Sequence, residues 1–188
     1  MVIWVNYSLL FATSNAMMNH MKSTLCSAWE VTDLGEPNKI AGIEITCSDG
    51  GITFSQQKYI ENLLLRKGMS KVNPVATPLD LNVKLIPNPD ENEPNQSNSY
   101  AKLLGNIQFI ANSTRSDISF AVNKLAAYTA NPSLQHHSTL KQILRYLAGT
   151  KTLGITYWKS QDDTKNKDLF HGYAPLSWVC RCSIHECR

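Results

Sequence analysis

Apolar residues between positions 99 and 150 recur three or four positions apart, which is the period of one face of an amphipathic α-helix. Polar breaks near residues 113–116 and 131–133 divide this pattern into three segments. The three apolar faces consist of Leu103, Leu104, Ile107, Ile110, Ala111, Ile118, Ala121, Val122, Leu125, Ala126, Leu140, Ile143, Leu144 and Leu147. Because the breaks are short, we predict three helices that pack on one another and bury these faces.

Small residues mark where these helices begin and end. Ser99 and Ser133 are predicted N-caps, because a serine oxygen can accept a hydrogen bond from an unpaired N–H of the first turn. Gly149 suits the left-handed position that follows a helix end.

The first 55 residues mostly carry short β-prone runs instead. Residues 2–13 read as strand, turn and strand, with the turn at residues 6–8. Two further strands are predicted over 40–46 and 51–55, because the Asp49-Gly50 pair between them is typical of a hairpin turn.

Two more helices are predicted in the first half of the chain. One covers residues 15–29, and its inward positions are Met18, Met21, Leu25 and Cys26. The other covers residues 56–67, with Ser55 as its cap and Gly68 as its end. The change from β-prone runs before Ser55 to helical periodicity after it predicts an α+β fold.

The charge is distributed unevenly along the chain, whose net charge is +3. Between residues 100 and 151 the one acid is Asp117, and the basic residues are Lys102, Arg115, Lys124, Lys141, Arg145 and Lys151. Two interpretations stay open, a solvated helical surface and a surface that contacts phosphate groups. For the second, the candidate contacts are Lys124, Lys141, Arg145 and Lys151.

Cysteine use and hydropathy predict an intracellular protein, cytoplasmic or nuclear and not secreted. The N-terminus lacks the basic segment of a signal peptide, and no run reaches the ~18 apolar residues of a membrane span. The thiols are therefore expected to be reduced. Cys180, Cys182, His185 and Cys187 carry zinc-ligand chemistry, but their spacing matches no zinc template, so no metal site is expected.

Four ordered pieces of the helical region resemble one known family. These pieces are Tyr100 to Ile110, Thr114-Arg115-Ser116-Asp117-Ile118, Asn131-Pro132 with His136, and Leu144 to Thr150. They are similar to the Pol polyproteins of copia-type LTR retrotransposons, where the C-terminal part of the reverse transcriptase runs into ribonuclease H. The departures are Lys102 for the usual arginine and Ser116 for the usual proline.

The resemblance implies partial reverse-transcriptase palm hairpins, then a helical thumb-like bundle and a short β stub. The implied segments are a partial palm with the first thumb helix (1–85), a mobile linker (86–98), the helical thumb or connection segment (99–150), a ribonuclease H start (151–178) and an unstructured tail (179–188). The linker is expected to be mobile because it holds three prolines, four asparagines and three acids.

The family implied by the resemblance synthesises DNA on an RNA template with two magnesium ions held by aspartates. The alignment places Asn6 and Tyr7 where two of those aspartates belong, and neither replaces a carboxylate ligand. Pro175 and Ser177 occupy carboxylate positions of the ribonuclease H segment. We therefore expect an inactive remnant of the polymerase that needs no cofactor, although the family itself uses magnesium.

The resemblance also indicates partners. The hairpin with Gly42 and Glu44 is similar to the one that supports the primer strand, and the alternative is a plain edge hairpin. Expected partners are an RNA or DNA primer–template duplex and other parts of Pol, and no membrane. The alternative function is a non-catalytic module that binds nucleic acid or another protein.

Overall fold

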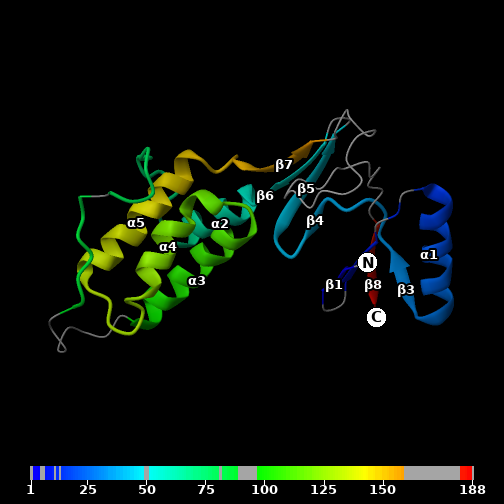
Figure 1. Ribbon diagram of the computed structural model, residues 1–188, viewed down its shortest axis with the longest axis horizontal. Helices are drawn as coiled ribbons and strands as arrows, with labels where there is room; N and C mark the ends of the chain where they lie inside the picture. Colours follow the sequence, from blue (N-terminus) through cyan, green and yellow to red (C-terminus); the bar gives the residue numbers. More distant parts are fainter. Residues whose placement is uncertain are drawn as a thin grey trace, which may run out of the picture. The chain divides into compact units, whose positions relative to one another are not determined.

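The structure is a computed structural model that describes residues 2–4, 7–10, 12, 14–48, 51–80, 82–88, 97–158 and 183–187. Residues 2–4, 7, 9 and 183–187 are described by their backbone alone. The chain forms two compact units, residues 1–54 with 156–188 and residues 55–155 (Figure 1). The mixture of helices and antiparallel strands confirms the predicted α+β class. Among the described helices, none combines the length and apolar character required to cross a membrane.

The first unit contains a sheet in the order β1-β2-β8-β3. Its strands are β1 (Val2–Trp4), β2 (Tyr7–Leu10), β3 (Val31–Asp33) and β8 (Ser183–Cys187). β8 pairs antiparallel with both β2 and β3, so the prediction of an unstructured tail is wrong for these residues. Backbone pairing with two neighbours gives this short polar run a place that its composition does not indicate.

The predicted N-terminal hairpin is confirmed, but its turn is shorter than expected. Trp4 pairs with Tyr7, which leaves two residues between β1 and β2. Tyr7 and Ser8 therefore belong to the second strand, whereas the sequence placed them in the turn. Asn6 lies outside the described residues.

Helix α1 (Asn15–Ala28) follows the hairpin and begins at the N-cap Ser14, whose side chain accepts a hydrogen bond from the Met17 N–H. Met18 packs with Leu10 and Ala12 in a small core. The other inward positions were predicted less well. Met21 and Leu25 are partly buried against this core, whereas Cys26 is exposed, which corrects its predicted inward placement.

A second sheet has the order β4-β5-β6-β7. Its strands are β4 (Lys39–Ile40), β5 (Ile43–Ser48), β6 (Gly51–Ser55) and β7 (Gly154–Trp158). The predicted strand over 40–46 is in fact two strands, because Ala41 and Gly42 form a tight turn with φ of 48° and 83°. Consecutive positive φ values are typical of the type I′ hairpin turn.

β7 lies against β6 at close range. A Cβ at Gly51 would collide with the carbonyl oxygen of Tyr157, so only glycine fits there. The Thr53 and Thr156 hydroxyls are hydrogen-bonded at 2.9 Å, and Phe54 meets Tyr157 edge to face. Residues 154–158 therefore form a strand that pairs with β6.

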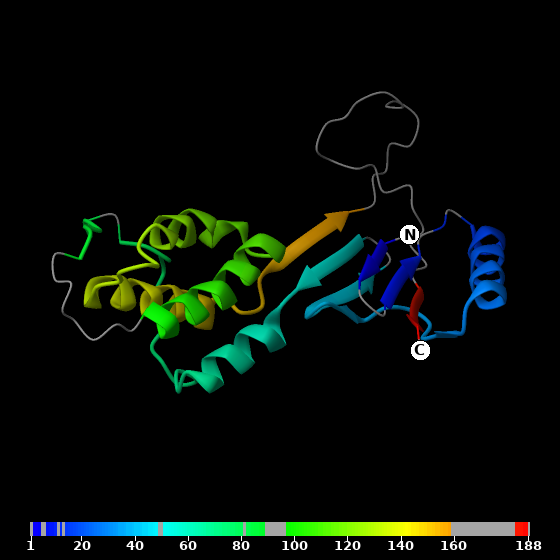
Figure 2. The same ribbon diagram turned by 90° about the horizontal axis from the view of Figure 1, so that it is seen from below.

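The second unit is helical (Figure 2). Its elements are α2 (Gln57–Arg66), α3 (Ser97–Ser113), the 3₁₀ turn η1 (Ser116–Ile118), α4 (Ser119–Ala126) and α5 (Leu134–Gly149). One core joins α2 to the three regions predicted to pack together. It is built from Ile60, Leu63, Leu64, Tyr100, Leu103, Leu104, Ile107, Ile110, Ala111, Ile118, Ala121, Val122, Leu125, Leu140, Ile143, Leu144 and Leu147. The predicted apolar faces are confirmed, except that Ala126 is only partly buried.

Helix termini were predicted less accurately than helix faces. Ser133 is the N-cap of α5, as expected. Ser55 ends β6, and Gln56 occupies the N-cap position of α2 without a capping hydrogen bond from its side chain. Helix α3 starts at Ser97 rather than after Ser99. Gly68, with φ of 66°, follows the end of α2 as predicted.

Gly149 is a helical residue, which corrects its predicted left-handed conformation. Its small size has another use, because a Cβ there would lie 2.8 Å from the Pro74 Cβ. Pro74 belongs to an irregular segment, residues 69–80 and 82–88, that we call the strap. The linker predicted over 86–98 is described only at its two ends, and residues 89–96 lie outside the described part of the chain.

The strap is tied to the helices mainly through its backbone carbonyls. Arg145 Nε donates to the Asn73 oxygen at 2.8 Å, and Gln142 Nε2 donates to the Thr77 oxygen at 3.4 Å. The Tyr128 hydroxyl donates to the Leu85 oxygen at 3.0 Å. Met69, Leu79 and Leu85 also pack on the core. The strap therefore lies along α5 on the side that carries Gln142, Arg145 and Gly149.

Truncation of a core residue tests this packing. Leu144 is 1% exposed, so Leu144→Ala should lower the free energy of unfolding by about 2–5 kcal/mol through lost burial and an unfilled cavity. Leu134→Ala, on the same helix but at a position 69% exposed, should change it by less than about 0.5 kcal/mol. Urea unfolding followed by circular dichroism measures both, and equal effects would contradict the packing.

Candidate functional site

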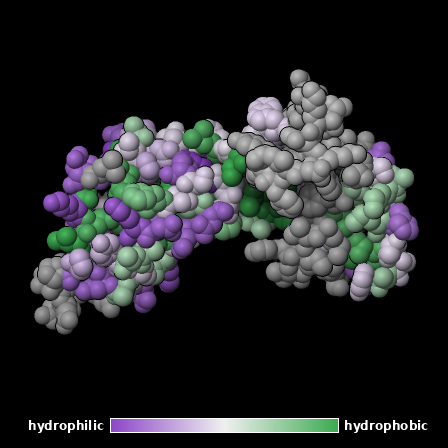
Figure 3. Space-filling view, in the orientation of Figure 1, coloured by the Kyte–Doolittle hydropathy of each residue, from purple (hydrophilic) through white to green (hydrophobic). Residues whose placement is uncertain are grey.

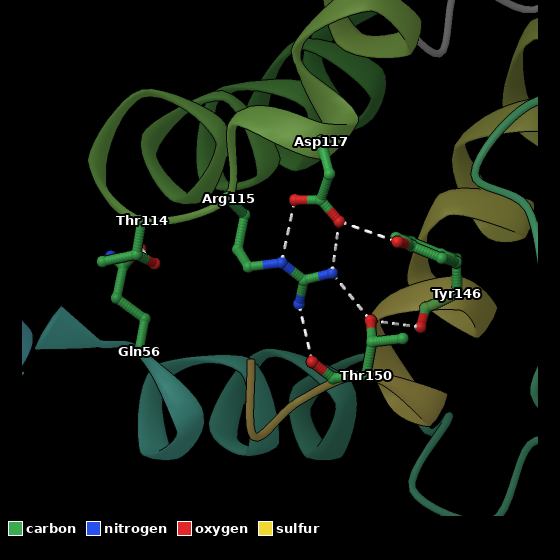
Figure 4. A network of polar contacts seen from close by, with 6 residues as sticks. All are labelled: Gln56, Thr114, Arg115, Asp117, Tyr146 and Thr150. Carbon is green, nitrogen blue, oxygen red and sulfur yellow. Dashed lines mark hydrogen bonds and ion pairs between the residues drawn. The ribbon is translucent and has the colours of Figure 1, made fainter. Parts of the chain in front are cut away.

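A buried arginine stands at the centre of the polar contacts in the helical unit (Figure 4). Arg115 is 2% exposed and lies between α3 and η1. Its Nε donates to Asp117 Oδ1 at 3.0 Å and its Nη2 donates to Asp117 Oδ2 at 2.7 Å. Nη1 and Nη2 also donate to the carbonyl and hydroxyl oxygens of Thr150, both at 2.7 Å. The planar guanidinium therefore makes a bidentate ion pair and caps the C-terminus of α5.

Two of the sequence pieces that carry the family resemblance meet in this network. The Thr150 hydroxyl also donates to the Tyr146 carbonyl at 2.8 Å, and the Tyr146 hydroxyl donates to Asp117 Oδ2 at 2.7 Å. The Arg115 guanidinium carbon lies 5.5 Å from the centre of the Tyr146 ring. These motif residues bind one another, so their chemistry is structural.

A further buried contact joins this corner to the start of α2. The Thr114 hydroxyl donates to Gln56 Oε1 at 2.8 Å, and both residues are buried (Figure 4). The α3–η1 corner is thereby held to both α2 and α5.

The network shifts the titration of its own members. Burial raises the pKa of Asp117, but hydrogen bonds from Arg115 and Tyr146 and the Arg115 charge outweigh burial, so the pKa is lowered overall. The hydrogen bond to Asp117 raises the pKa of Tyr146, with burial as the second cause. The carboxylate is thus kept charged and the phenol protonated.

Substitution of the carboxylate tests the network. Asp117→Asn leaves the buried guanidinium without its anion, and the free energy of unfolding should fall by about 1–3 kcal/mol at pH 7. Because the folded-state pKa of Asp117 is lowered, its contribution is complete above the unfolded pKa of about 4 and is lost as pH falls through the folded pKa. Between pH 7 and pH 2.5, the free energy of unfolding measured with denaturant should fall less in Asp117→Asn than in the wild-type chain. Asp80→Asn, an exposed aspartate on the strap, is the control, and an equal effect of both variants would refute the assignment.

The structure separates the four predicted phosphate contacts into two kinds. Lys124 and Lys141 are exposed on α4 and α5. The Arg145 guanidinium is bound to the strap through Asn73, and Lys151 Nζ forms an ion pair with Glu61 at 3.1 Å. Arg115, the other arginine of the basic region, is buried. Of the four predicted contacts, Lys124 and Lys141 are therefore the best placed to meet an anionic partner.

An exposed aromatic residue accompanies one of these lysines. Phe120 is 60% exposed, and Lys124 Nζ lies 5.0 Å from the centre of its ring. The two residues are one turn apart on α4, so helical spacing alone places them together.

Gly42 and Glu44 lie on the β4–β5 hairpin of the first unit. Gly42 is the second residue of the turn. Glu44 is on β5 and pairs with Lys39 of β4. Gly42 and Glu44 are both half-buried. Next to this turn is a hollow of about 340 Å³, and its lining residues are Leu34, Glu36, Asn38, Lys39, Ile40, Ala41 and Gly42. The segment that resembles the primer-supporting hairpin does form a hairpin in this structure. Contact between Gly42 or Glu44 and a primer strand stays a prediction.

The remaining predicted positions cannot be assembled into a site. Asn6, Pro175 and Ser177 lie outside the described residues, as do Cys180 and Cys182, and Tyr7 is described by its backbone alone. Within the described part of the chain, no group of three or more His, Cys, Asp and Glu side chains could hold a metal ion.

Sequence reasoning missed the Arg115 network although it contained a usable signal. Asp117 is the one acid between residues 100 and 151, and it follows Arg115 by two residues. A count of charges assigns Arg115 to a basic surface and does not reveal that the two residues pair. Thr150, 35 residues away, gave no signal of its own.

Comparisons with known proteins point to one family. A model of the reverse transcriptase (RNA-dependent DNA polymerase) family matches residues 1–81. The chain is 32% identical over 186 residues to the retrovirus-related Pol polyprotein from transposon RE2 of Arabidopsis thaliana, covering 95% of this chain and 12% of that protein. It is 31% identical over 157 residues to the Pol polyprotein from transposon TNT 1-94 of Nicotiana tabacum, covering 80% and 12% respectively.

A shorter relative is an uncharacterized mitochondrial protein of Arabidopsis thaliana, 32% identical over 164 residues, which are 85% of this chain and 65% of that protein. No solved structure matches. The chain thus spans only 12% of the length of the two Pol polyproteins.

Proposed function

Because the chain belongs to the reverse transcriptase family of copia-type retrotransposon Pol polyproteins, we propose that residues 55–155 are a thumb-like unit that contacts nucleic acid without catalysing synthesis. The partner is a primer–template duplex or its single-stranded extension. The first unit would then correspond to part of the palm.

One observation carries this proposal, namely how the charges between residues 97 and 155 are partitioned. Between residues 97 and 155 the one carboxylate, Asp117, is bound by the buried Arg115, whereas Lys124 and Lys141 point their charge to solvent. The visible face of the unit is a mixture of hydrophilic and hydrophobic residues (Figure 3). Unneutralised cations on such a surface favour a polyanion, whose binding releases counterions.

Phe120 adds a second kind of contact. An exposed ring can stack on an unpaired nucleobase, while the adjacent Lys124 meets the neighbouring phosphate. This pair supports contact with single-stranded nucleic acid in addition to a duplex.

The hairpin at the N-terminus supports the non-catalytic part of the proposal. The resemblance assigns metal-binding aspartates to positions 6 and 7, where this chain has asparagine and tyrosine. Magnesium prefers carboxylate oxygens, so these two side chains fit the ion poorly. The pairing of Trp4 with Tyr7 puts position 7 at the start of β2.

Salt-dependent binding tests the nucleic-acid contact. Replacing Lys124 and Lys141 together with glutamine should weaken binding of a labelled primer–template about tenfold and reduce the slope of log K against log salt by close to two, since each lost phosphate contact contributes about 0.9. The matched control replaces two other exposed lysines, Lys67 and Lys71, with glutamine. Fluorescence anisotropy at several salt concentrations measures both. An unchanged slope in the first variant would refute the proposed surface.

Primer extension tests the absence of catalysis. With magnesium, a primer–template and nucleotides, the purified chain should extend no primer above background, because Asn6 and Tyr7 do not replace carboxylates. Asn6→Ala serves as the control. Magnesium-dependent extension that survives both repurification and the Asn6→Ala substitution would show that the alignment of the turn is wrong.

A further inference from the structure

Helix α5 starts with an unusual cap in which histidine takes the role of an acceptor. Ser133 is the N-cap, and its backbone N–H donates to His136 Nδ1 at 2.9 Å. The Ser133 hydroxyl lies 3.0 Å from the same nitrogen. His136 is therefore in the third helical position, where capping boxes usually carry glutamate or glutamine. Its side chain is 0% exposed.

This geometry determines the protonation state of the imidazole. A ring nitrogen accepts a hydrogen bond from an N–H only through its lone pair, so Nδ1 must be unprotonated and the single proton must be on Nε2. In the imidazolium both nitrogens are donors. The Ser133 hydroxyl can accept a hydrogen bond from the protonated Nδ1. The Ser133 N–H would then face another donor and lose its acceptor.

Among the described residues, no negative charge acts on His136 to stabilise an imidazolium. The Tyr128 ring is stacked on it at 4.1 Å between centroids, and Nε2 is buried with no hydrogen-bond partner among the described residues. His137 follows it in sequence and meets Tyr100 edge to face at 5.1 Å. The one carboxylate of residues 97–155, Asp117, is held by Arg115.

Burial and the neighbouring positive charges disfavour protonation of both His136 and His137. Burial lowers the pKa of His136, and the neighbouring His137 lowers it further. Burial and then the charge of Lys141 lower the pKa of His137. Burial raises the pKa of Tyr100 to about 12, so this phenol supplies no negative charge at physiological pH.

We propose that His136 makes the start of α5 a pH-sensitive joint, which is closed when the imidazole is neutral and opens when it takes up a proton. Opening frees the first turn of α5 and the preceding residues 127–133. Two contacts transmit the change to the strap, the Tyr128 hydroxyl on the Leu85 oxygen and Asn88 Nδ2 on Asn131 Oδ1 at 3.2 Å.

The direction of the effect follows from linkage. Because the closed state binds the proton more weakly than the open state, the closed state is fully favoured above the ordinary histidine pKa of about 6.5 and loses its advantage as pH falls below it. One proton taken up on opening raises the opening constant by at most about tenfold per pH unit.

Hydrogen exchange of the amides of residues 137–140 between pH 7.5 and pH 5.0, corrected for intrinsic rates, tests the joint. In the wild-type chain protection should fall with pH. His136→Gln keeps an acceptor in the capping box and cannot titrate, so its protection should stay constant. His137→Gln is the matched control and should retain the fall.

Equal pH dependence in the wild type and His136→Gln would overturn the proposal. If His136→Gln does not fold, the nitrogen chemical shifts of the wild-type imidazole decide the question. A neutral ring with its proton on Nε2, which then titrates together with the loss of protection, supports the joint. A proton on Nδ1 at neutral pH refutes it. Nucleic acid takes no part in either measurement, so this test is independent of the proposed function.

Discussion

The helical unit depends on the burial of one positive charge. A guanidinium removed from water is costly unless oxygens surround it, and Arg115 reaches four oxygens, two on Asp117 and two on Thr150. These acceptors come from η1 and from the end of α5, so both must be in place before the arginine can be buried. The apolar core supplies the bulk of the stabilisation, and the arginine determines how the corner and the helix end are arranged.

Helical periodicity predicted most of the core because packing follows the repeat closely. Leu104, Ile118 and Leu144 were all identified from spacing, and each is at most 3% exposed. Termini were harder to predict, since serine suits both a cap and the first turn, as the start of α3 at Ser97 shows. The turn at Ala41 and Gly42 was missed because alanine seldom adopts positive φ and the flanking residues read as one β-prone run.

The candidate surface could be predicted only in part, because the sequence lists charges and not their partners. Arg145 and Lys124 look equivalent in a charge count, but Arg145 is bound to Asn73, 72 residues away. Lys151 pairs with Glu61, which lies still further away in the chain. Contacts of this range depend on how helices and strap pack, which no local pattern encodes. The histidine cap was within reach of sequence reasoning, since Ser133 and His136 have the spacing of a capping box.

The acceptors of Arg115 also limit how this chain can be divided. A recombinant piece or a shortened gene copy that stops between residues 118 and 150 would keep the cation and its aspartate but lose the Thr150 oxygens. One that starts after residue 56 would lose the glutamine that binds Thr114. The smallest autonomous folding segment therefore has to include everything from Gln56 to Thr150, and crossover points in natural or designed chimaeras belong outside that interval.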